Sequence, residues 1–306
     1  MATLPLPRGA EGLASLTELP SDGWAERWDR IIVPEPIKDR LLNFGAFFFG
    51  PRAGYSAVGL PVHGLIVLQG PPGTGKTTLA GGLAAKLAEI VGGHGLFFLV
   101  IDAHALPSQL LGESQRSVAR LFERTLPDLA ALGRPTVVLL DEVEALAVNR
   151  SGASLETNPV DVHRATDAVL AGMDHVAAAC RNVLFVATTN HIAGVDRAFL
   201  SRADLIEDID LPAVEAMEAI LRDTLREIRP GFASADPRLH AFAVACHERG
   251  LDARRLRKLV VRALVRRREL AVEPALLEID DLESALDEDA PWSAPVAPGA
   301  NPIRGT

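Results

Sequence analysis

Cysteine is scarce in this chain of 306 residues, because it occurs only as Cys180 and Cys246. Two cysteines are too few for a disulfide-stabilised scaffold or for a zinc site built from several thiolates. Basic residues are also in the minority, since 31 lysines and arginines stand against 40 aspartates and glutamates and leave a net charge of −9. This balance argues against a protein that binds nucleic acid over a broad basic surface.

Long apolar runs and targeting signals are missing as well. No uncharged apolar stretch reaches the roughly 18–20 residues needed to cross a bilayer. Residues 1–7 lack the basic and then apolar segments of a secretion signal. The eight histidines are scattered and do not have the spacing of metal ligands. We therefore expect a reduced, cytoplasmic protein with no membrane partner, whose 48% of hydrophobic residues can form a substantial core.

Short aliphatic runs alternate with helical patterns between residues 26 and 211. The runs predict strands at residues 64–69, 96–101, 136–140 and 183–187, with a weaker one around residues 206–209. Helices are predicted between them at residues 77–91, 114–131 and 160–179. This alternation predicts a large α/β domain with a five-stranded parallel sheet covered by helices on both faces.

The regions outside this alternation have different compositions. Residues 1–25 are rich in proline, glycine and alanine, and we expect them to form a flexible N-terminal arm. Residues 212–290 have helical patterns only, which predicts a small all-helical domain. Residues 291–306 again favour proline, alanine and glycine and are predicted to be a disordered tail.

A glycine-rich segment connects the first predicted strand of the sheet to the helix that follows it. Its residues fit the pattern G-x-x-x-x-G-K-[ST] and are Gly70, Pro71, Pro72, Gly73, Thr74, Gly75, Lys76 and Thr77. Backbone N–H groups of such a loop surround phosphates, and the helix N-terminus adds a positive dipole. Lys76 is predicted to reach the β- and γ-phosphates and the Thr77 hydroxyl to bind Mg²⁺. We extend the predicted nucleotide-binding segment to Thr78, and we expect Gly81 and Gly82 to allow this helix to pack closely on its strand.

Polar side chains follow two of the other predicted strands. Asp141 at the tip of strand 136–140 suits metal coordination, directly or through water, beside the phosphate loop. Glu142 is placed to polarise a water for attack on the γ-phosphorus. Asn190, just after strand 183–187, can hold that water or the γ-phosphate. The phosphate loop upstream makes a hydrolytic site the better interpretation than a solvated acidic turn.

These motifs resemble those of the AAA+ ATPases, and the resemblance covers nearly all of residues 28–286. It implies ATP with Mg²⁺ as the bound nucleotide, a helical lid formed by residues 212–290, and a hexameric ring of identical subunits. In that family Lys76 and Thr77 would belong to the Walker A motif, Asp141 and Glu142 to the Walker B motif, and Asn190 would be sensor 1.

The resemblance also assigns residues that act between subunits. Arg202 matches the position of an arginine finger that reaches the neighbouring subunit's nucleotide, and Arg197 is the alternative candidate. Arg254 matches the sensor 2 position of the lid. Leu110, Leu111 and Gly112 match the substrate-gripping pore loop, although the family usually has an aromatic residue where Leu110 stands; Leu110 could instead pack in a subunit interface.

Several further stretches are similar to one clade, the pachytene-checkpoint ATPases that remodel HORMA-domain proteins. They lie at residues 101–106, 141–146, 157–170, 201–204 and 250–259. The short segment before the phosphate loop resembles the bacterial branch found in CBASS antiphage systems. The resemblance implies a HORMA-domain protein as partner, which ATP hydrolysis would convert from a closed to an open form.

Two other functions stay open at this point. A AAA+ module that acts on nucleic-acid complexes, such as a clamp-loader or initiator subunit, requires a basic surface that the net charge of −9 does not favour. A nucleotide-locked scaffold with negligible turnover would have no need of Glu142 and Arg202. All three alternatives retain a nucleotide site.

Overall fold

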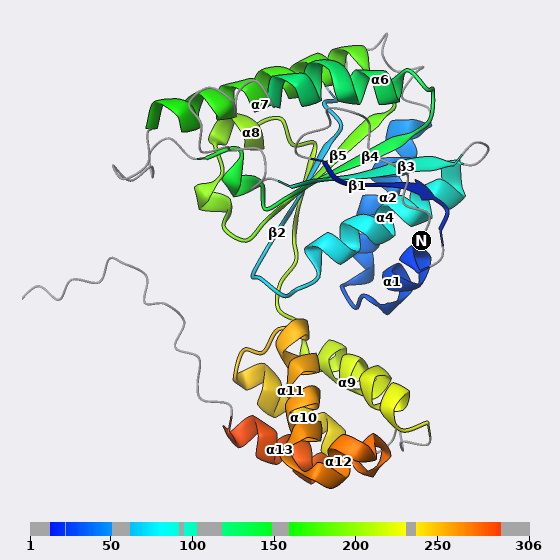
Figure 1. Ribbon diagram of the computed structural model, residues 1–306, viewed down its shortest axis with the longest axis vertical. Helices are drawn as coiled ribbons and strands as arrows, with labels where there is room; N and C mark the ends of the chain where they lie inside the picture. The colour runs from blue at the N-terminus through cyan, green and yellow to red at the C-terminus, as the bar shows by residue number, and fades with distance from the viewer. Residues whose placement is uncertain are drawn as a thin grey trace, which may run out of the picture. The chain divides into compact units, whose positions relative to one another are not determined.

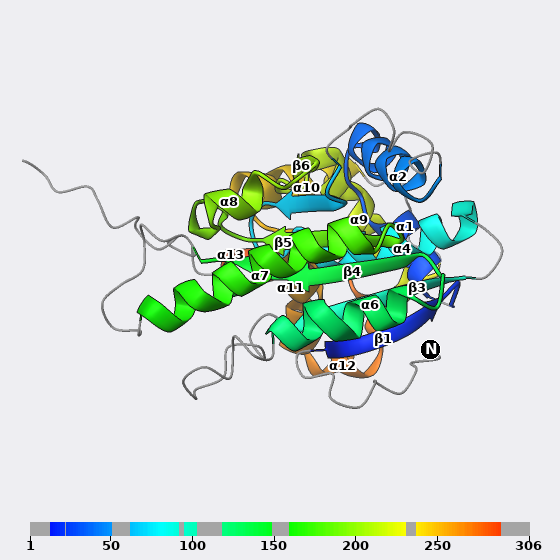
Figure 2. The ribbon, with the colours of Figure 1, turned by 90° about the horizontal axis from the view of Figure 1, so that it is seen from above.

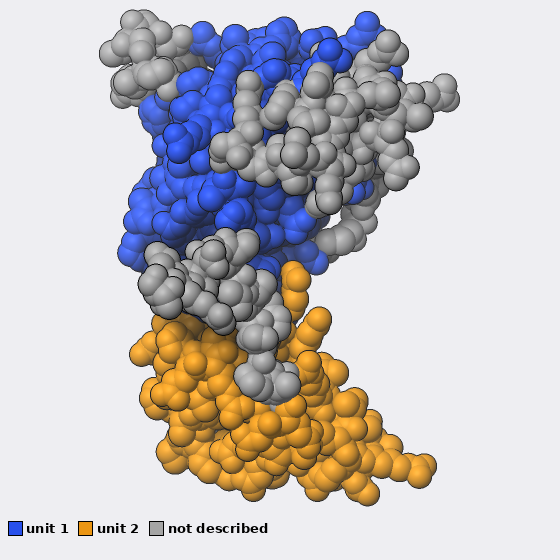
Figure 3. All heavy atoms as spheres, turned by 90° about the vertical axis from the view of Figure 1, so that its left-hand side faces the viewer, with its two compact units in different colours: residues 1–211 blue, residues 212–306 orange. Residues whose placement is uncertain are grey.

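The computed structural model describes residues 13–21, 23–50, 62–91, 95–102, 118–148, 159–230 and 237–288. The chain divides into two compact units, residues 1–211 and residues 212–306, which Figure 3 shows in blue and orange. The first unit contains all the strands of the described residues, and the second is built from helices.

The sheet of the first unit has six strands in the order β1-β3-β4-β5-β2-β6. The strands are β1 (Leu13–Leu19), β2 (Leu65–Gln69), β3 (Leu96–Asp102), β4 (Thr136–Asp141), β5 (Val183–Thr189) and β6 (Leu205–Asp208). Strands β2 to β6 run parallel to their neighbours, whereas β1 pairs with β3 in the antiparallel direction. The predicted α/β fold is confirmed, with a mixed sheet that is mostly parallel.

Helices cover both faces of this sheet (Figures 1 and 2). One face packs against α6 (Leu126–Ala130) and α7 (Pro159–Ala179), and the other against α1 (Trp24–Arg30), α2 (Glu35–Phe49) and α4 (Lys76–Val91). Side chains of a strand point alternately to the two faces. In β4, Val138 and Leu140 accordingly join the α6/α7 core, and Val137 and Leu139 join the α4 core. The strands are continuous apolar runs because both faces are buried.

Strand β1 corrects two expectations from the sequence, a flexible arm through residue 25 and a sheet of five strands. Residues 13–19 pair with residues 96–101 of β3, and Leu13, Leu16 and Leu19 are buried. The register shifts between Leu13 and Ser15, which brings Leu13 and Leu16 to the same face of the sheet, whereas Leu19 belongs to the core of the other face. This irregularity removes the alternating pattern that predicts a strand. Residues 1–12, the remainder of the predicted arm, lie outside the described residues.

The two glycines inside α4 are required for a different reason from the one expected, which was close packing on a strand. A Cβ atom at Gly81 would lie 2.0 Å from Cζ3 of Trp24, and one at Gly82 would lie 3.0 Å from the Cα of Trp28. Both tryptophans belong to α1, so the glycines allow α1, and not the strand, to approach α4 closely. Trp24 also packs edge-on against Phe98 of β3, with 5.3 Å between ring centroids.

Short elements complete the first unit. The π-helical turn η2 (Leu121–Thr125) leads into α6, and the 3-10 turns η3 (Val143–Ala145) and η4 (Ile192–Gly194) follow β4 and β5. Helix α8 (Arg197–Leu200) begins after Asp196, whose side chain accepts a hydrogen bond from the backbone N–H of Ala198 at 2.8 Å.

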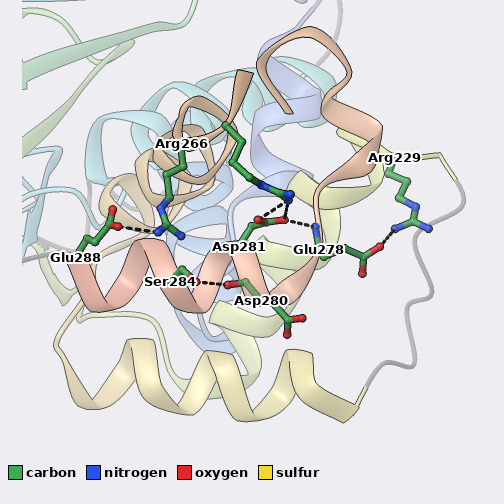
Figure 4. A network of polar contacts seen from close by, with 8 residues as sticks. Arg229, Arg266, Glu278, Asp280, Asp281, Ser284 and Glu288 are labelled. Carbon is green, nitrogen blue, oxygen red and sulfur yellow. Dashed lines mark hydrogen bonds and ion pairs between the residues drawn. The ribbon is translucent and has the colours of Figure 1, made fainter. Parts of the chain in front are cut away.

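The second unit consists of α9 (Val214–Ile228), α10 (Pro237–Glu248), α11 (Ala253–Arg266), α12 (Arg268–Val272), the 3-10 turn η5 (Pro274–Leu276) and α13 (Ile279–Glu288). Each of the four longer helices buries one apolar stripe; in α11 this stripe is Leu256, Leu259, Val260 and Ala263. Charged side chains connect the segments on the outside (Figure 4): Arg266 with Glu288 at 2.7 Å, and Arg229 with Glu278 at 3.2 Å.

Candidate nucleotide-binding site

Three neighbouring strands bring the predicted site residues to one edge of the sheet. β5 lies between β2 and β4, and all three run parallel, so their carboxyl ends meet at the same edge. The phosphate loop leaves the end of β2, the Asp141–Glu142 pair ends β4, and Asn190 follows β5. In an open parallel α/β sheet, ligands bind at this edge.

The phosphate loop has a backbone that requires glycine. Gly70, Gly73 and Gly75 have φ angles of 144°, 83° and 94°, which L-residues with a side chain rarely adopt. At Gly70 a Cβ atom would also lie 2.1 Å from the carbonyl oxygen of Ile209, so no side chain fits there. Within the loop, the Thr74 hydroxyl donates a hydrogen bond to the Pro71 carbonyl at 3.0 Å.

Lys76 is the first residue of α4 and is buried, with 6% of its surface exposed. Its ammonium group donates hydrogen bonds to the carbonyls of Gly70 at 2.7 Å and Pro71 at 2.8 Å and to Oδ1 of Asn190 at 2.9 Å. Desolvation of a charged group is costly unless hydrogen bonds replace its water, which these three do. The cation is therefore fixed between the phosphate loop and the end of β5.

Asp141 accepts hydrogen bonds from two hydroxyl groups on its Oδ1 atom. Thr77 Oγ1 donates at 2.8 Å and Thr188 Oγ1 at 2.5 Å. The buried Thr188 hydroxyl also accepts from the backbone N–H of Glu142 at 3.0 Å, so it joins Asp141 at the end of β4 and the following Glu142 to β5. The hydroxyl of Thr77 and the carboxylate of Asp141 thus lie within hydrogen-bonding distance across the phosphate loop.

Glu142 is the only residue other than glycine with a positive φ in the described part of the chain, at 54°. Such a conformation costs on the order of 1–3 kcal/mol and is common at functional sites. Its Oε1 atom accepts a hydrogen bond from Nδ2 of Asn190 at 3.3 Å, and the side chain is exposed at the site. Asn190 is held in turn by Glu144, whose Oε1 accepts the Asn190 backbone N–H at 3.0 Å. Asn190 therefore stands between the Lys76 cation and the Glu142 carboxylate.

This set of groups fits a magnesium–nucleotide complex. Hydroxyl and carboxylate oxygens are the ligands that Mg²⁺ prefers, and this ion usually takes only one or two protein ligands together with substrate phosphates. Thr77 and Asp141 provide such a pair, while Lys76 and the N–H groups of the loop provide positive charge for phosphates. Within the described residues, no group of three or more histidine, cysteine, aspartate or glutamate side chains is placed to hold a metal ion.

The two candidate finger arginines lie close together but have different surroundings. Arg202 follows α8 and donates from Nε and Nη2 to the two carboxylate oxygens of Asp174 on α7, each at 2.7 Å. These hydrogen bonds lower the pKa of the Asp174 carboxyl and raise the pKa of Arg202. Arg197 is the exposed first residue of α8.

Asp204, two residues beyond Arg202, has a structural role. Its carboxylate accepts hydrogen bonds from the backbone N–H groups of His63, Gly64 and Leu65, at 3.1, 2.6 and 2.9 Å. It thereby fixes the start of β2, the strand that leads to the phosphate loop.

The other predicted residues lie elsewhere or outside the described part of the chain. Arg254 is at the start of α11 in the second unit, where its backbone N–H donates to the capping carboxylate of Asp252 at 2.8 Å. Thr78 follows Thr77 in α4. The predicted pore loop, residues 110–112, is outside the described residues. No helix of the described residues is both long and apolar enough to span a membrane.

Two residues of this site were not predicted from the sequence. Thr188 joins Asp141 to the backbone of Glu142, and Glu144 anchors the backbone of Asn190. Thr188 belongs to the polar end of β5, and Glu144 follows the acidic pair by two residues. The sequence shows both residues near the predicted site, but only the pairing of β4 with β5 shows which atoms their side chains contact.

Comparison with known proteins agrees with this geometry. Residues 66–211 match the model of the ATPase family associated with various cellular activities (AAA). The chain is 43% identical over 289 residues to CD-NTase-associated protein 6 of Pseudomonas aeruginosa, and the match covers 93% of each protein. It is also 32% identical over 227 residues to a pachytene checkpoint protein 2 homologue of Oryza sativa subsp. indica. The chain belongs to the family of CD-NTase-associated protein 6 and contains an AAA ATPase domain.

The eukaryotic relatives of this AAA ATPase are longer. The matched region covers 72% of this chain but 48% of the Oryza sativa protein, and 70% of this chain but 51% of the Danio rerio homologue. The chain therefore corresponds to about half the length of these relatives.

Solved structures share the fold of this AAA ATPase. A chain in the E. coli MS115-1 HORMA:CdnC:Trip13 complex matches with a TM-score of 0.77 at 20% identity, over 94% of this chain and 98% of that one. The structure of C. elegans PCH-2 matches with a TM-score of 0.71 at 24% identity, over 90% of this chain and 75% of that one. The predicted AAA+ fold is confirmed.

Proposed function

We propose that this AAA ATPase hydrolyses ATP with Mg²⁺ at the edge formed by β2, β5 and β4. The observation that carries this proposal is the chain of hydrogen bonds from Lys76 through Asn190 to Glu142, next to the Thr77–Asp141 pair. The fixed positions of these groups support catalysis, because donors that are already oriented need no rearrangement when charge develops in the transition state.

Each residue has a distinct role in this proposal. Residues 70–78 surround the phosphates, and Lys76 donates to the β- and γ-phosphate oxygens in place of the loop carbonyls it now contacts. Thr77 and Asp141 hold Mg²⁺, directly or through water, and the ion when bound neutralises phosphate charge. Glu142 orients and deprotonates the attacking water, and Asn190 keeps the carboxylate and that water in line.

Two arginines complete the proposed site. Arg202 of a neighbouring subunit supplies positive charge to the transferred phosphoryl group, with Arg197 as the alternative. Arg254, in the second unit, contacts phosphate from the subunit's own lid. A site that needs an arginine from a neighbour requires an assembly, and we propose a homo-hexameric ring.

We further propose that the ring remodels a HORMA-domain protein and regulates a CBASS antiphage system in the bacterial cytoplasm, where ATP is supplied. The 43% identity to CD-NTase-associated protein 6 over 93% of the chain supports this assignment. So does the occurrence of the same fold in a HORMA:CdnC:Trip13 complex. Leu110, Leu111 and Gly112 are proposed to grip the HORMA protein in the pore.

Steady-state release of phosphate tests the enzymatic part. We expect turnover that depends on Mg²⁺ and a Glu142→Gln variant that binds ATP but loses roughly 10²–10⁴-fold in kcat. Unchanged turnover in this variant would exclude Glu142 as the base. Stimulation by DNA that falls steeply with salt would instead favour a nucleic-acid substrate.

Release of a fluorescent peptide from a closed HORMA–peptide complex tests the substrate. We expect release with ATP and the wild-type ring, and none with Glu142→Gln. Leu110→Ala is expected to lower release while ATP hydrolysis continues. Leu132→Ala is the matched control, because this leucine lies outside the proposed pore loop and is 63% exposed. If release does not require ATP, the remodelling assignment is wrong. If the two leucine variants release the peptide equally well, the pore-loop assignment is wrong.

A further inference from the structure

The guanidinium group of Arg202 is fixed by its own subunit at three points. Nε and Nη2 donate to the two carboxylate oxygens of Asp174, each at 2.7 Å. Nη1 donates to the backbone carbonyl of Ala198 at 2.7 Å. The two partners belong to different helices, since Asp174 lies in the 21-residue helix α7 and Ala198 in the short helix α8.

This arrangement leaves part of the guanidinium available. Arginine has five N–H donors in a planar group, and three are used by Asp174 and Ala198. One N–H remains on Nη1 and one on Nη2. Two terminal N–H groups of an arginine can bind two oxygens of one phosphoryl group. Asp174 therefore does not prevent Arg202 from binding a phosphate.

We propose that Asp174 is a positioning residue for Arg202, which it holds in the orientation needed to reach the nucleotide of the neighbouring subunit. This inference rests on the proposed function, in which Arg202 acts between subunits. It also favours Arg202 over Arg197 as the finger, because Arg202 is the one whose guanidinium has a bidentate partner on a long helix.

The surroundings of the pair support orientation over simple charge neutralisation. The Arg202 side chain is only 21% exposed, whereas that of Asp174 is 49% exposed. Because Asp174 remains half-exposed to solvent, the pair adds only about 0–1 kcal/mol of stability, and its main effect here is geometric. A freely rotating arginine would sample many rotamers before it found the phosphate, and a bidentate carboxylate removes this search.

Substitution of Asp174 separates orientation from binding. We expect Asp174→Ala to lower kcat roughly 10–100-fold while KM for ATP changes less than about threefold, because misplacement of a catalytic group affects mainly the transition state. Asp174→Asn keeps the size but only one acceptor oxygen, so its kcat should lie between those of Asp174→Ala and wild type. Arg202→Ala should have the lowest kcat of the three variants, roughly 10³-fold or more below that of wild type. Thermal melting and ring formation should be close to wild type in all three.

Rings of mixed composition provide a readout that a structural defect would not change. Asp174→Ala and Glu142→Gln subunits, co-expressed with different affinity tags and purified on both, form rings in which each variant has one intact function. A subunit with Asp174→Ala retains its own Glu142, and its Glu142→Gln neighbour retains a correctly held Arg202. We expect these mixed rings to hydrolyse ATP several-fold faster than the average of the two pure rings. Rings that mix Arg202→Ala with Glu142→Gln are the positive control.

Each outcome decides between specific alternatives. If the control mixture recovers activity and the Asp174→Ala mixture does not, Asp174 acts within its own subunit and the inference is wrong. Faster turnover in Asp174→Ala than in wild type would make the pair an inhibitory contact, which also overturns it. Failure of the control mixture would reject Arg202 as the finger, and Asp174 with it, while leaving ATP hydrolysis by Lys76 and Glu142 untouched.

Discussion

The two units hold their charged groups in different ways. In the first unit, Lys76 and Thr188 are buried, and their hydrogen bonds connect three strand ends that are far apart in the sequence. In the second unit, pairs such as Arg266 with Glu288 and Arg267 with Asp281 lie on the outside of the helices (Figure 4). Buried polar groups need specific partners, whereas exposed ones can exchange theirs for water. We infer that the position of each charge matters for function at the site in the first unit. At these ion pairs of the second unit, the charges contribute mainly to solubility.

Substitutions of a buried and a surface lysine in α4 test this difference, and we expect them to give the largest effect on ATP turnover. We expect Lys76→Ala to lose roughly 10²–10³-fold or more in kcat/KM, because a buried cation for phosphate is removed. Lys86→Ala is the matched control on the same helix, since Lys86 forms ion pairs with Asp29 and Glu89 at 3.8 and 3.5 Å, away from the phosphate loop. The measurement is ATP turnover as a function of ATP concentration. Equal losses in the two variants would show that α4 itself, and not the buried ammonium, is sensitive.

Glycine 81 tests whether the packing beneath the site is as tight as the structure indicates. An alanine inside a helix normally adds about 0.5–1 kcal/mol of stability relative to glycine. At Gly81 we expect the opposite, a loss of roughly 1–3 kcal/mol in the free energy of unfolding, because the new methyl group would lie 2.0 Å from Trp24. Chemical denaturation measures this change.

A double variant is the control for that prediction. Gly81→Ala combined with Trp24→Ala should show a positive coupling, since the second substitution removes the clash created by the first. A Gly81→Ala protein that is more stable than wild type would contradict the packing of α1 on α4.

Glu144 tests the part of the site that the sequence did not reveal. Glu144→Ala removes the acceptor of the Asn190 N–H group, so we expect roughly a 10-fold loss in kcat with little change in ATP binding. Glu144→Gln retains an acceptor oxygen and should keep most of the activity. If Glu144→Gln is as slow as Glu144→Ala, the negative charge and not the hydrogen bond to Asn190 is what matters.

Ion pairs of the second unit should give the smallest effect. The Arg266 side chain is 30% exposed and that of Glu288 64% exposed. We expect Arg266→Ala, Glu288→Ala and the double variant each to change the free energy of unfolding by less than about 1 kcal/mol, and less still at high salt. Turnover should not change. A large loss of ATP hydrolysis in any of them would show that this surface takes part in the mechanism, and the contrast between the two units would then be wrong.

The two cysteines report on the units separately. Burial raises the pKa of the Cys180 thiol in the first unit and raises that of Cys246 in the second unit to about 12. A neutral buried thiol stabilises the folded state below the ordinary thiol pKa, and this contribution is lost as the pH rises toward 12. At pH 8 we expect iodoacetamide to label both thiols only when a unit opens, and mass spectrometry in rising denaturant should show which unit opens first. Rapid labelling of Cys246 in the native protein would contradict its burial.

The sequence predicted the core of the site and most of the fold. Continuous aliphatic runs identified β2, β3, β4 and β5, because a strand buried on both faces has no polar residues to obscure it. The helical pattern of residues 212–290 has a different basis, which α9 illustrates: its buried residues Met217, Ile220, Leu221 and Leu225 recur at the spacing of one helix face. Asp141 and Asn190 could be identified because polar residues stand out at the ends of such strands, and Lys76 because it belongs to the glycine-rich pattern.

Features that depend on contacts between distant segments were not predictable in this way. β1 was missed because a register shift at its start and burial on both of its faces leave no regular alternation. Gly81 was expected to face a strand, but its neighbour is Trp24, which only the packing of α1 reveals. Thr188 and Glu144 have ordinary local sequences, and their roles follow from which atoms of β4 and β5 meet. Asp174 is one of three aspartates in α7, and only the folded chain shows that it is the one beside Arg202.

The central claim is that the lysine of the phosphate loop and the carboxylates of β4 form one magnesium–ATP site that a neighbouring subunit completes. A high-resolution structure of the Glu142→Gln variant with ATP and Mg²⁺ tests it directly. We predict that the β- and γ-phosphates contact Lys76, that the metal lies beside Thr77 and Asp141, and that Arg202 of the adjacent subunit reaches the γ-phosphate while still paired with its own Asp174. Nucleotide bound away from Lys76, or a single subunit that encloses the γ-phosphate with no neighbour in contact, would contradict the account.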